Sequence, residues 1–277
     1  MLDKALGFAP DAFIPDLEDS VPDAEKENAR LITAAHLDKL GASGIPVIPR
    51  VNALRSGWFE EDLAAVVGPS IYGISIGKIQ TADDISSISE IMAGAERKAG
   101  VEVGKVRLIP WIETASAVVH CYQICRASPR IAAVAFGAED FTDDMGIERT
   151  DDEAEVAFAR SSVCIAARAA GVDALDTPFF RFKDPNGLAV NVCAARQLGF
   201  KGKFAIHPAQ IETINSMFLP SDADIEYAQR IVAAFEGAER TGRGSTSLAG
   251  KVVDVPVVKR ARSTLLLAEA QTKPGKS

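Results

Sequence analysis

The chain has 277 residues, of which 47% are hydrophobic and 25% charged, and its formal net charge is -8. This composition is typical of a globular protein with one large domain or two small ones. The acidic balance argues against a general nucleic-acid-binding protein, whose surface would be basic. The apolar runs are too short to cross a bilayer, and the first residues lack the layout of a signal peptide. We therefore expect a cytoplasmic protein that binds neither nucleic acid nor membranes.

Short apolar runs alternate with longer amphipathic stretches over the first 220 residues. The predicted strands cover residues 12–17, 45–51, 71–76, 106–112, 131–136, 172–175 and 204–206. The predicted helices cover residues 23–40, 60–67, 82–99, 115–127, 152–170, 187–198 and 208–218. Strands that alternate with helices imply βαβ units and a parallel sheet. Residues 45–51 are the weakest of these strands because Pro46 and Pro49 cannot donate to a ladder.

Polar side chains lie at the ends of the predicted strands. They are Asp16, Glu18, Asp19, Arg50, Asn52, Lys78, Glu113, Glu139, Asp140, Asp176 and His207. In a TIM barrel the carboxyl ends of all strands converge on one face, whereas an open doubly wound sheet gathers its ligand at one or two switch points. The wide distribution of polar residues favours the barrel, although only seven strands are found. We predict an α/β fold, a TIM (β/α)8-type barrel that lacks its first strand in this chain.

The pattern changes after residue 220. A predicted helix over residues 223–240, a Gly-rich turn at 241–246 and a last helix over 257–270 do not form another βα unit. We predict a catalytic barrel over residues 1–220, a C-terminal helical lid over 221–270 and a disordered tail over 271–277.

Four cysteines are too few for a disulfide scaffold in a chain of this length. Cys121 and Cys125 are four residues apart, and His120 is the one further candidate ligand beside them. A zinc site needs more ligands, so buried free thiols are the preferred interpretation. The same interpretation holds for Cys164 and Cys193.

Two carboxylates follow successive predicted strands. Glu113 comes directly after residues 106–112, and Asp140 lies shortly after residues 131–136. In a barrel the two side chains would be neighbours, and carboxylates combined with water and substrate oxygens suit Mg²⁺. Either carboxylate alone would more simply be a helix cap or part of a salt bridge, but the pair favours a metal site. Arg50, at another strand end, could bind a carboxylate through two parallel hydrogen bonds.

An acidic cluster ends the first predicted strand. Asp16, Glu18 and Asp19 could orient metal-bound water at the mouth of the barrel. They could equally form ion pairs with Lys26 and Arg30 on the following helix, and the residues alone leave both interpretations open.

Several segments, taken in order, resemble the citrate lyase beta-subunit-like proteins of the HpcH/HpaI aldolase superfamily. The segments are Asp16-Leu17-Glu18-Asp19-Ser20-Val21 with Lys26 and Arg30; Arg50-Val51-Asn52; Ile112-Glu113-Thr114; Phe136-Gly137-Ala138-Glu139-Asp140-Phe141; Asp176-Thr177-Pro178; and Gly199-Phe200-Lys201-Gly202-Lys203 leading into Ala205-Ile206-His207-Pro208. The resemblance covers nearly the whole chain. It implies a Mg²⁺-dependent TIM-barrel lyase, with Mn²⁺ as an alternative metal. Such an enzyme cleaves or forms a 3-hydroxyacyl-CoA thioester such as malyl-CoA, citramalyl-CoA or citryl-CoA, with acetyl-CoA and a 2-oxo acid as the products of cleavage.

The resemblance also implies a role for each matching residue. Glu113 and Asp140 correspond to the Mg²⁺ ligands, and Glu113 also faces the substrate. Arg50 corresponds to the arginine that binds the carboxylate of the oxo acid. Glu18 and Asp19 correspond to catalytic acids close to the metal.

Asp254, in Val253-Asp254-Val255-Pro256, resembles the family's catalytic acid/base. In the family this residue lies on a C-terminal lid that reaches a neighbouring subunit, so the resemblance implies a homo-oligomer, either a trimer or a hexamer. The competing interpretation makes Asp254 the N-cap of the last helix, with Pro256 in its first turn.

Two features depart from the family pattern. The usual first strand, of the type Arg-Ser-Leu-Leu-Phe, and the Pro-Gly loop after it do not occur in the sequence. In addition, Ile76-Gly77-Lys78 stands where many relatives carry Leu-Pro-Lys. Two alternatives to the lyase are a CoA-independent pyruvate-type class II aldolase, against which the lid with Asp254 argues, and a non-catalytic homologue of the family.

Overall fold

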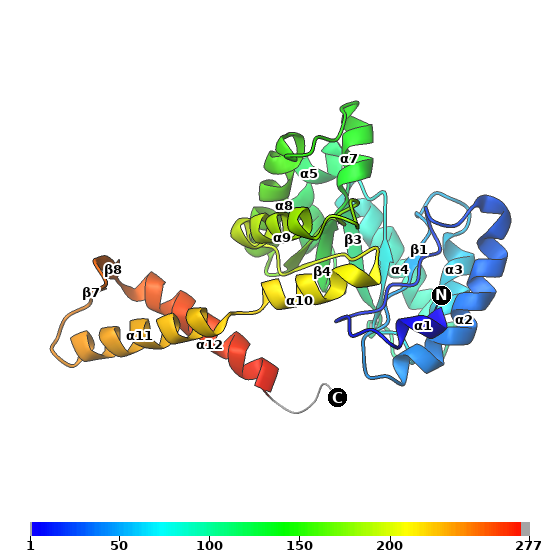
Figure 1. The fold of residues 1–277 in the computed structure, drawn as a ribbon. Coiled ribbons are helices and arrows are strands. Elements are labelled where there is room, and N and C mark those ends of the chain that lie inside the picture. The colour runs from blue at the N-terminus through cyan, green and yellow to red at the C-terminus, as the bar shows by residue number, and fades with distance from the viewer. Residues whose placement is uncertain (1, 273–277) are drawn as a thin grey trace. The chain divides into compact units, whose positions relative to one another are not determined.

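Figure 1 shows a computed structural model of the chain, and the structure describes residues 2–272. The chain divides into two compact units, Met1–Ile214 and Asn215–Ser277. The division falls within helix α10 (Ile211–Phe218), whereas the sequence analysis places the domain boundary after residue 220.

A parallel sheet of six strands forms the centre of the first unit, with the strands in chain order from β1 to β6. They are β1 (Arg50–Val51), β2 (Gly73–Ile76), β3 (Arg107–Ile112), β4 (Ala133–Phe136), β5 (Asp173–Asp176) and β6 (Gly202–Lys203). Every residue of β2 and β4 is buried, as in parallel sheets that are covered on both faces. Because chain order equals sheet order, each connection places the next strand beside the last one.

Helices alternate with these strands (Figure 1). They are α1 (Leu2–Ala5), α2 (Lys26–Gly41), α3 (Phe59–Val66), α4 (Ala82–Lys98), α5 (Ala115–Val119), α6 (Cys121–Arg126), α7 (Ala138–Met145), α8 (Ala157–Ala170) and α9 (Pro185–Leu198), with short 3-10 helices η1 (Asp23–Glu25), η2 (Ala154–Val156) and η3 (Pro208–Gln210). Neighbours in the series α2, α3, α4, α6, α8, α9 pack against one another. This succession of helix pairs is the outer layer expected of a (β/α) barrel.

Two strand predictions at the start of the barrel need adjustment. Residues 12–17 do not form a full ladder but two isolated parallel bridges, Phe13 with Val47 and Asp16 with Arg50. The strand predicted at residues 45–51 is reduced to β1, in keeping with the two prolines that interrupt its hydrogen bonding.

The last strand also differs from its prediction, because β6 is Gly202–Lys203 and not residues 204–206. The main-chain N–H groups of Ile206 and His207 donate to the side chain of Gln210, which forms a capping box at η3. The chain therefore leaves the sheet before residues 204–206 and begins η3 at Pro208, where the predicted helix also starts.

The inner core of the barrel joins both ends of the sheet. The buried residues of this core are Ile48, Ile109, Trp111 and Ala135. The partly buried side chains that pack against them are Ala12, Ile14, Leu175 and Phe204. The rings of Trp111 and Phe204 lie 4.4 Å apart between centroids. Since side chains from residues 12–17 and from beyond β6 meet in one cluster, the sheet curves into the predicted TIM-barrel arrangement.

The second unit contains helices α11 (Asp222–Glu239) and α12 (Val255–Thr272) and a hairpin of β7 (Thr246–Leu248) and β8 (Lys251–Val253). Its core consists of Ala228, Ile231, Phe235, Val253, Val258 and Ala261. The hairpin was not predicted. Its two-residue turn places Ala249 at φ 50° and Gly250 at φ 76°, the left-handed pair that tight hairpins require.

The end of the chain only partly meets its prediction. Helix α12 includes residues 271 and 272, the first two of the predicted disordered tail, and residues 273–277 lie outside the described residues. Within residues 2–272, none of the helices combines the length and the apolar character needed to span a membrane.

Candidate functional site

The polar residues predicted at strand ends come together at the carboxyl ends of β1 to β4. They are Glu18 and Asp19 after residues 12–17, Arg50 in β1, Lys78 after β2, Glu113 after β3 and Asp140 in the first turn of α7. The structure thereby unites all the predicted site residues of the first unit. It places Asp140 on a helix that the sequence analysis did not predict, directly after the short loop that follows β4.

Glu113 is the most deeply buried acid of this cluster, with 2% of its surface exposed. Its Oε1 accepts a hydrogen bond from the main-chain N–H of Lys78. Burial, reinforced by the nearby charge of Asp140, raises the pKa of Glu113 to about 8. A cation bound beside this buried carboxyl group would stabilise its ionised form.

Two glycines leave room for the carboxylates. A Cβ atom on Gly137 would lie 2.6 Å from Glu113 Oε2 and 2.9 Å from Glu113 Cβ. A Cβ atom on Gly77 would lie 2.7 Å from Glu113 Oε1 and 3.0 Å from Glu18 Oε1. Gly77, which stands where many relatives carry proline, therefore borders the carboxylates directly.

Glu18 is the second buried acid of the cluster, with 5% of its surface exposed. Its Oε1 is buried and has no hydrogen-bond partner, and its Oε2 lies 3.3 Å from Arg50 Nη1. Burial and the adjacent Asp19 raise the pKa of Glu18 to about 7. A buried carboxylate oxygen without a hydrogen-bond donor is costly, and a bound cation would reduce that cost.

Arg50 is held by Asp16 on the neighbouring segment. Nε donates to Asp16 Oδ1 at 2.7 Å and Nη2 donates to Oδ2 at 2.6 Å. The guanidinium also lies 5.7 Å from the ring centroid of Trp111. Burial acts to raise the pKa of Asp16, but the hydrogen bonds and charge of Arg50 outweigh it and the pKa is lowered. Asp16 therefore stays ionised and fixes the plane of the guanidinium.

Lys78 is the other cation of the cluster. Its Nζ lies 3.1 Å from Asp19 Oδ1, 3.6 Å from Glu18 Oε1 and 3.7 Å from Asp140 Oδ1. Lys78 was noted at a strand end without a role in the site, and Asp16 was expected to orient metal-bound water and not to hold Arg50. Register between adjacent strands was the signal that could have found both, because strand-end residues of neighbouring strands lie side by side.

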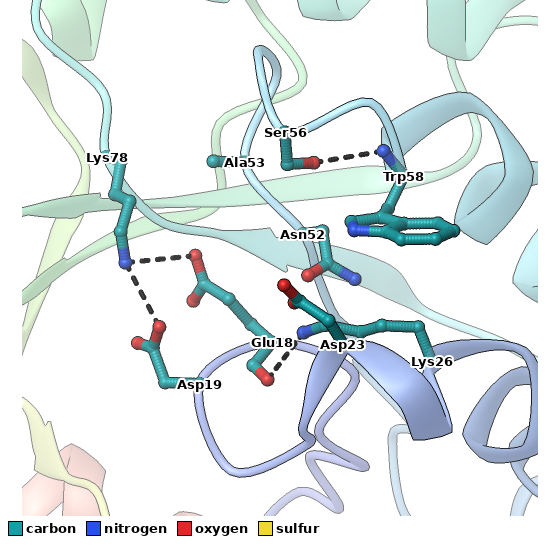
Figure 2. Close-up of a pocket in the computed structure, with 9 residues that line it drawn as sticks. All are labelled: Glu18, Asp19, Asp23, Lys26, Asn52, Ala53, Ser56, Trp58 and Lys78. Carbon is teal, nitrogen blue, oxygen red and sulfur yellow. Dashed lines mark hydrogen bonds and ion pairs between the residues drawn. The ribbon is translucent and has the colours of Figure 1, made fainter.

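The acidic cluster does not pair with the following helix, the other interpretation that the sequence left open. Lys26 Nζ donates to the main-chain carbonyls of Leu17 at 2.9 Å and Glu18 at 2.8 Å, and not to a carboxylate of the cluster. Arg30 forms ion pairs with Glu61 and Asp62 of α3. Figure 2 shows the contact between Lys26 and the carbonyl of Glu18 below the cavity.

A cavity of about 250 Å³ adjoins the cluster (Figure 2). It is lined by Glu18, Asp19, Asp23, Lys26, Asn52, Ala53, Ser56, Trp58 and Lys78. Lys78 lies on one side of it in Figure 2 and the Trp58 ring on the other, with Asn52 between them. A polar ligand group beside the carboxylates would therefore meet donors and acceptors on several sides.

The residues of the site fit a magnesium ion. They offer carboxylate oxygens, the ligand atoms that Mg²⁺ prefers, among them Glu18 Oε1, which accepts no hydrogen bond, and Gly77 and Gly137 leave space beside them. Among the described residues no three His, Cys, Asp or Glu side chains are arranged to hold a metal by themselves. Two carboxylates with water and substrate oxygens, as the sequence analysis expects, would suit Mg²⁺ because it keeps several waters.

Asp254 belongs to the second unit and caps helix α12. Its Oδ1 accepts a hydrogen bond from the N–H of Val257 at 3.1 Å, and its carbonyl accepts from Val258 at 3.0 Å. Pro256 occupies the first turn. The interpretation of Asp254 as an N-cap is therefore confirmed. Its carboxylate is half-buried, and only Oδ1 takes part in the cap. The catalytic role of Asp254 stays a prediction.

The cysteines lie away from this chemistry. Cys121, Cys125 and Cys164 are buried free thiols, as predicted, and the Sγ atoms of the first two are 3.9 Å apart. Cys193 is also a free thiol, but it is exposed and not buried as predicted. Its Sγ accepts a hydrogen bond from Gln197 Nε2 in α9.

Comparison with known proteins identifies the family. Residues 1–208 match the HpcH/HpaI aldolase/citrate lyase family. The chain belongs to this family. The citrate lyase subunit beta of Leuconostoc mesenteroides subsp. cremoris is 36% identical over 263 residues, which are 95% of this chain and 87% of that protein. The (3S)-malyl-CoA thioesterase of Cereibacter sphaeroides (strain ATCC 17025) is 35% identical over 269 residues, which are 97% of this chain and 90% of that protein.

A solved structure of the HpcH/HpaI family supports the same fold. CitE from Mycobacterium tuberculosis, crystallised in complex with magnesium, acetoacetate and coenzyme A, superimposes with a TM-score of 0.74. It is 28% identical, and the match covers 92% of this chain and 89% of that one. The α/β fold of TIM-barrel type and the family predicted from the sequence are thus confirmed.

Proposed function

We propose that this member of the HpcH/HpaI family is a Mg²⁺-dependent lyase that cleaves or forms the C2–C3 bond of a 3-hydroxyacyl-CoA thioester. The observation that carries the proposal is the convergence of buried Glu113, Asp140 and the Asp16-bound Arg50 at one end of the barrel. Two relatives support a CoA ester as the substrate, because one is named citrate lyase subunit beta and the other (3S)-malyl-CoA thioesterase. The CitE complex with magnesium and coenzyme A supports the metal and the cofactor class.

Glu113 and Asp140 would hold the divalent cation, Mg²⁺ or alternatively Mn²⁺. A cation bound there supplies a Lewis acid that stabilises the negative charge developing on a substrate oxygen. Glu18 and Asp19 share the Nζ atom of Lys78 with Asp140 and would hold water by accepting its hydrogen bonds. Burial of Glu113 and Glu18 excludes bulk water and so strengthens these interactions.

Arg50 would bind the carboxylate of the 2-oxo acid. Asp16 occupies its Nε and one edge of Nη2, which leaves Nη1 directed toward Glu18 and Asp19. A substrate carboxylate placed beside the metal would accept hydrogen bonds from this remaining edge. Arginine suits the role because its planar, always charged group binds carboxylates in a fixed orientation.

Bond cleavage needs a proton at carbon. When the C2–C3 bond of the substrate breaks, the hydroxyl gives up its proton to water, its carbon becomes the carbonyl of the 2-oxo acid, and the electron pair of the broken bond forms the enolate of acetyl-CoA. Asp254 in its acid form would protonate the enolate carbon, and its carboxylate would remove the methyl proton in the reverse reaction. We propose that Asp254 acts in the site of a neighbouring subunit, within a homotrimer or a hexamer.

An acetyl-CoA release assay identifies the substrate. Purified protein is incubated with Mg²⁺ and malyl-CoA, citramalyl-CoA or citryl-CoA, and acetyl-CoA and the matching oxo acid are quantified by mass spectrometry. Equal amounts of both products from one ester support the proposed lyase. Absence of cleavage with all three esters, under conditions in which a known lyase cleaves them, contradicts it.

Thioester hydrolysis is a second candidate activity, favoured by the thioesterase relative that is 35% identical. The same assay separates the two activities. Hydrolysis of malyl-CoA yields free CoA and malate, with no acetyl-CoA and no oxo acid.

A further inference from the structure

The side-chain ammonium of Lys78 lies among carboxylates from three different segments. Its distances to Asp19, Glu18 and Asp140 range from 3.1 to 3.7 Å. Figure 2 shows the Nζ atom directed at Asp19 and Glu18 from the opposite side of the cavity to Trp58. One cation thus interacts with three carboxyl groups, one of which belongs to the predicted metal ligand Asp140.

The main chain at Lys78 contributes to the same cluster. Its N–H donates to Glu113 Oε1, and its φ of 58° lies in the left-handed region that residues other than glycine rarely adopt. Such a conformation persists only where surrounding contacts enforce it. Both ends of Lys78 therefore contact the acidic cluster, the main chain at Glu113 and the side chain at the other three carboxylates.

We propose that Lys78 is a built-in counter-ion that competes with the divalent cation for Glu18, Asp19 and Asp140. A divalent ion held by Asp140 and Glu113 would lie within a few ångströms of the Nζ position, and two cations so close repel each other strongly in a partly buried site. The inference rests on the metal site of the proposed function. Lys78 would then set how tightly the protein holds its metal.

The side chain of Lys78 is able to leave the carboxylates. It is 44% exposed and borders the 250 Å³ cavity, so its four-carbon chain has space to turn away while the N–H of the same residue stays on Glu113. A lysine ammonium is a compact positive charge at neutral pH, so this side chain competes with a metal ion whenever it lies among the carboxylates.

The test measures metal binding without catalysis. Wild-type protein, Lys78→Met and Lys78→Arg are stripped with EDTA, dialysed and titrated with MgCl₂ by isothermal calorimetry, with Lys105→Met as the control because Lys105 is an exposed residue before β3. We expect Lys78→Met to bind Mg²⁺ roughly 10-fold more tightly, because a unit charge a few ångströms away is removed. Lys78→Arg keeps the positive charge and Lys105→Met removes a distant one, so both should stay within about twofold of the wild type. Stripped Lys78→Met should also melt at a lower temperature and gain more from added Mg²⁺ than the wild type.

A second measurement covers the case in which Lys78→Met does not fold. Wild-type protein carrying ¹³C at lysine Cε is titrated with MgCl₂, and the resonance missing from Lys78→Arg is assigned to Lys78. Its shift should saturate together with the calorimetric binding curve. An unmoved resonance, or a Lys78→Met variant that binds Mg²⁺ no more tightly than the wild type, overturns the role of Lys78 and leaves the metal site standing. If the wild type binds no Mg²⁺ at all, the proposed metal site fails and the role of Lys78 fails with it.

Discussion

Asp16 and Arg50 form a bidentate ion pair across two adjacent parallel segments, through hydrogen bonds of 2.7 Å and 2.6 Å. The isolated bridge between the two residues sets their main chains side by side, so the side chains leave on the same face. With the ring of Trp111 5.7 Å from the guanidinium, Arg50 has little freedom to rotate. This arrangement orients the arginine before any substrate arrives.

Loosening this pair should weaken binding of the oxo acid. Asp16→Asn keeps the shape of the side chain but removes its charge, so Arg50 loses its fixed orientation. Arg50→Lys loses the planar fork and should have the larger effect. We expect KM for the oxo acid in the condensation direction to rise about 10-fold or more for both, because a charged hydrogen bond contributes roughly 1.5–3 kcal/mol. Asp38→Asn, at an exposed surface contact with Ser70, is the control, and an unchanged KM in both variants would remove Arg50 from the site.

The metal prediction concerns Glu113 and Asp140. Glu113→Gln and Asp140→Asn keep the size of each side chain but remove a charged oxygen ligand, so Mg²⁺ binding and turnover should both be lost. Stripped Glu113→Gln should melt at a higher temperature than stripped wild type, since it no longer buries an ionisable group in a site that disfavours its charge. Glu139→Gln is the matched control, because Glu139 adjoins Asp140 but pairs with Arg149 at 3.0 Å. Near-full turnover in both ligand variants would show that the metal is held elsewhere.

Mg²⁺ binding should release protons near neutral pH. The ordinary pKa of a glutamate is 4.5, and burial raises the pKa of Glu18 to about 7 and of Glu113 to about 8. Because these pKa values are raised, the folded protein binds more protons than the unfolded chain above pH 4.5. The stabilisation from the neutral forms is complete below that pH and is lost as the pH rises through about 7 to 8.

Two measurements check this pH dependence. Stripped protein should lose thermal stability as the pH is raised from about 6 to about 9, and Mg²⁺ should restore more of it at the higher pH. Calorimetry in buffers of different ionisation enthalpy should find roughly one proton released per Mg²⁺ near neutral pH and almost none near pH 9. A Mg²⁺ affinity that is flat over this range, with no proton release, would mean that neither Glu113 nor Glu18 lies at the metal site.

Gly137→Ala tests the space that the metal ligands need. The backbone at Gly137 has a φ of -108°, which alanine adopts freely, so close approach and not conformation explains the glycine. The added Cβ would lie 2.9 Å from Glu113 Cβ and would displace the side chain. We expect Mg²⁺ affinity to fall 10-fold or more while the far-ultraviolet circular dichroism is unchanged, and Gly94→Ala, where open space surrounds the Cβ position, should match the wild type.

The sequence predicted the barrel because its signals are local and repeated. Alternating apolar and amphipathic stretches located five of the six strands of the sheet and nearly all the helices of the first unit. The sixth strand was misplaced because Gln210 turns the chain into η3 at Ile206 and His207. The β7–β8 hairpin was missed because its strands have three residues each and alanine occupies a left-handed turn position.

A site residue could be predicted where its type and its place at the end of a strand are enough to suggest its role. Glu113, Asp140 and Arg50 stand out for that reason, and the structure brings them together. The interactions of Asp16 and Lys78 depend on which side chains meet between adjacent strands, and that depends on register. The contact of Lys78 with three carboxylates also needs its positive φ, which the residue type does not signal.

Asp254 combines two roles that one pair of substitutions separates. As the N-cap of α12 it accepts a hydrogen bond from Val257 at 3.1 Å, and asparagine caps helices about as well as aspartate. Asp254→Asn should therefore keep the stability of the wild type but lose turnover, because an amide cannot donate or accept the proton at carbon. Asp254→Ala should lose turnover and in addition about 1 kcal/mol of unfolding free energy. An Asp254→Asn enzyme with unchanged kcat would limit Asp254 to capping.

Mixing then tests whether Asp254 serves a neighbouring subunit. Inactive Asp254→Asn protein and inactive Glu113→Gln protein are combined under conditions that allow subunits to exchange, and exchange is followed by native mass spectrometry. If Asp254 acts across the subunit boundary, some sites in the mixed oligomers contain an intact Glu113 from one chain and an intact Asp254 from the next. Activity should then reappear, approaching about a quarter of the wild-type value for random mixing of equal amounts, since each site draws its two groups independently. Exchange without recovered activity, or an active wild-type enzyme that sediments as a monomer, would place Asp254 in the site of its own chain or outside catalysis altogether.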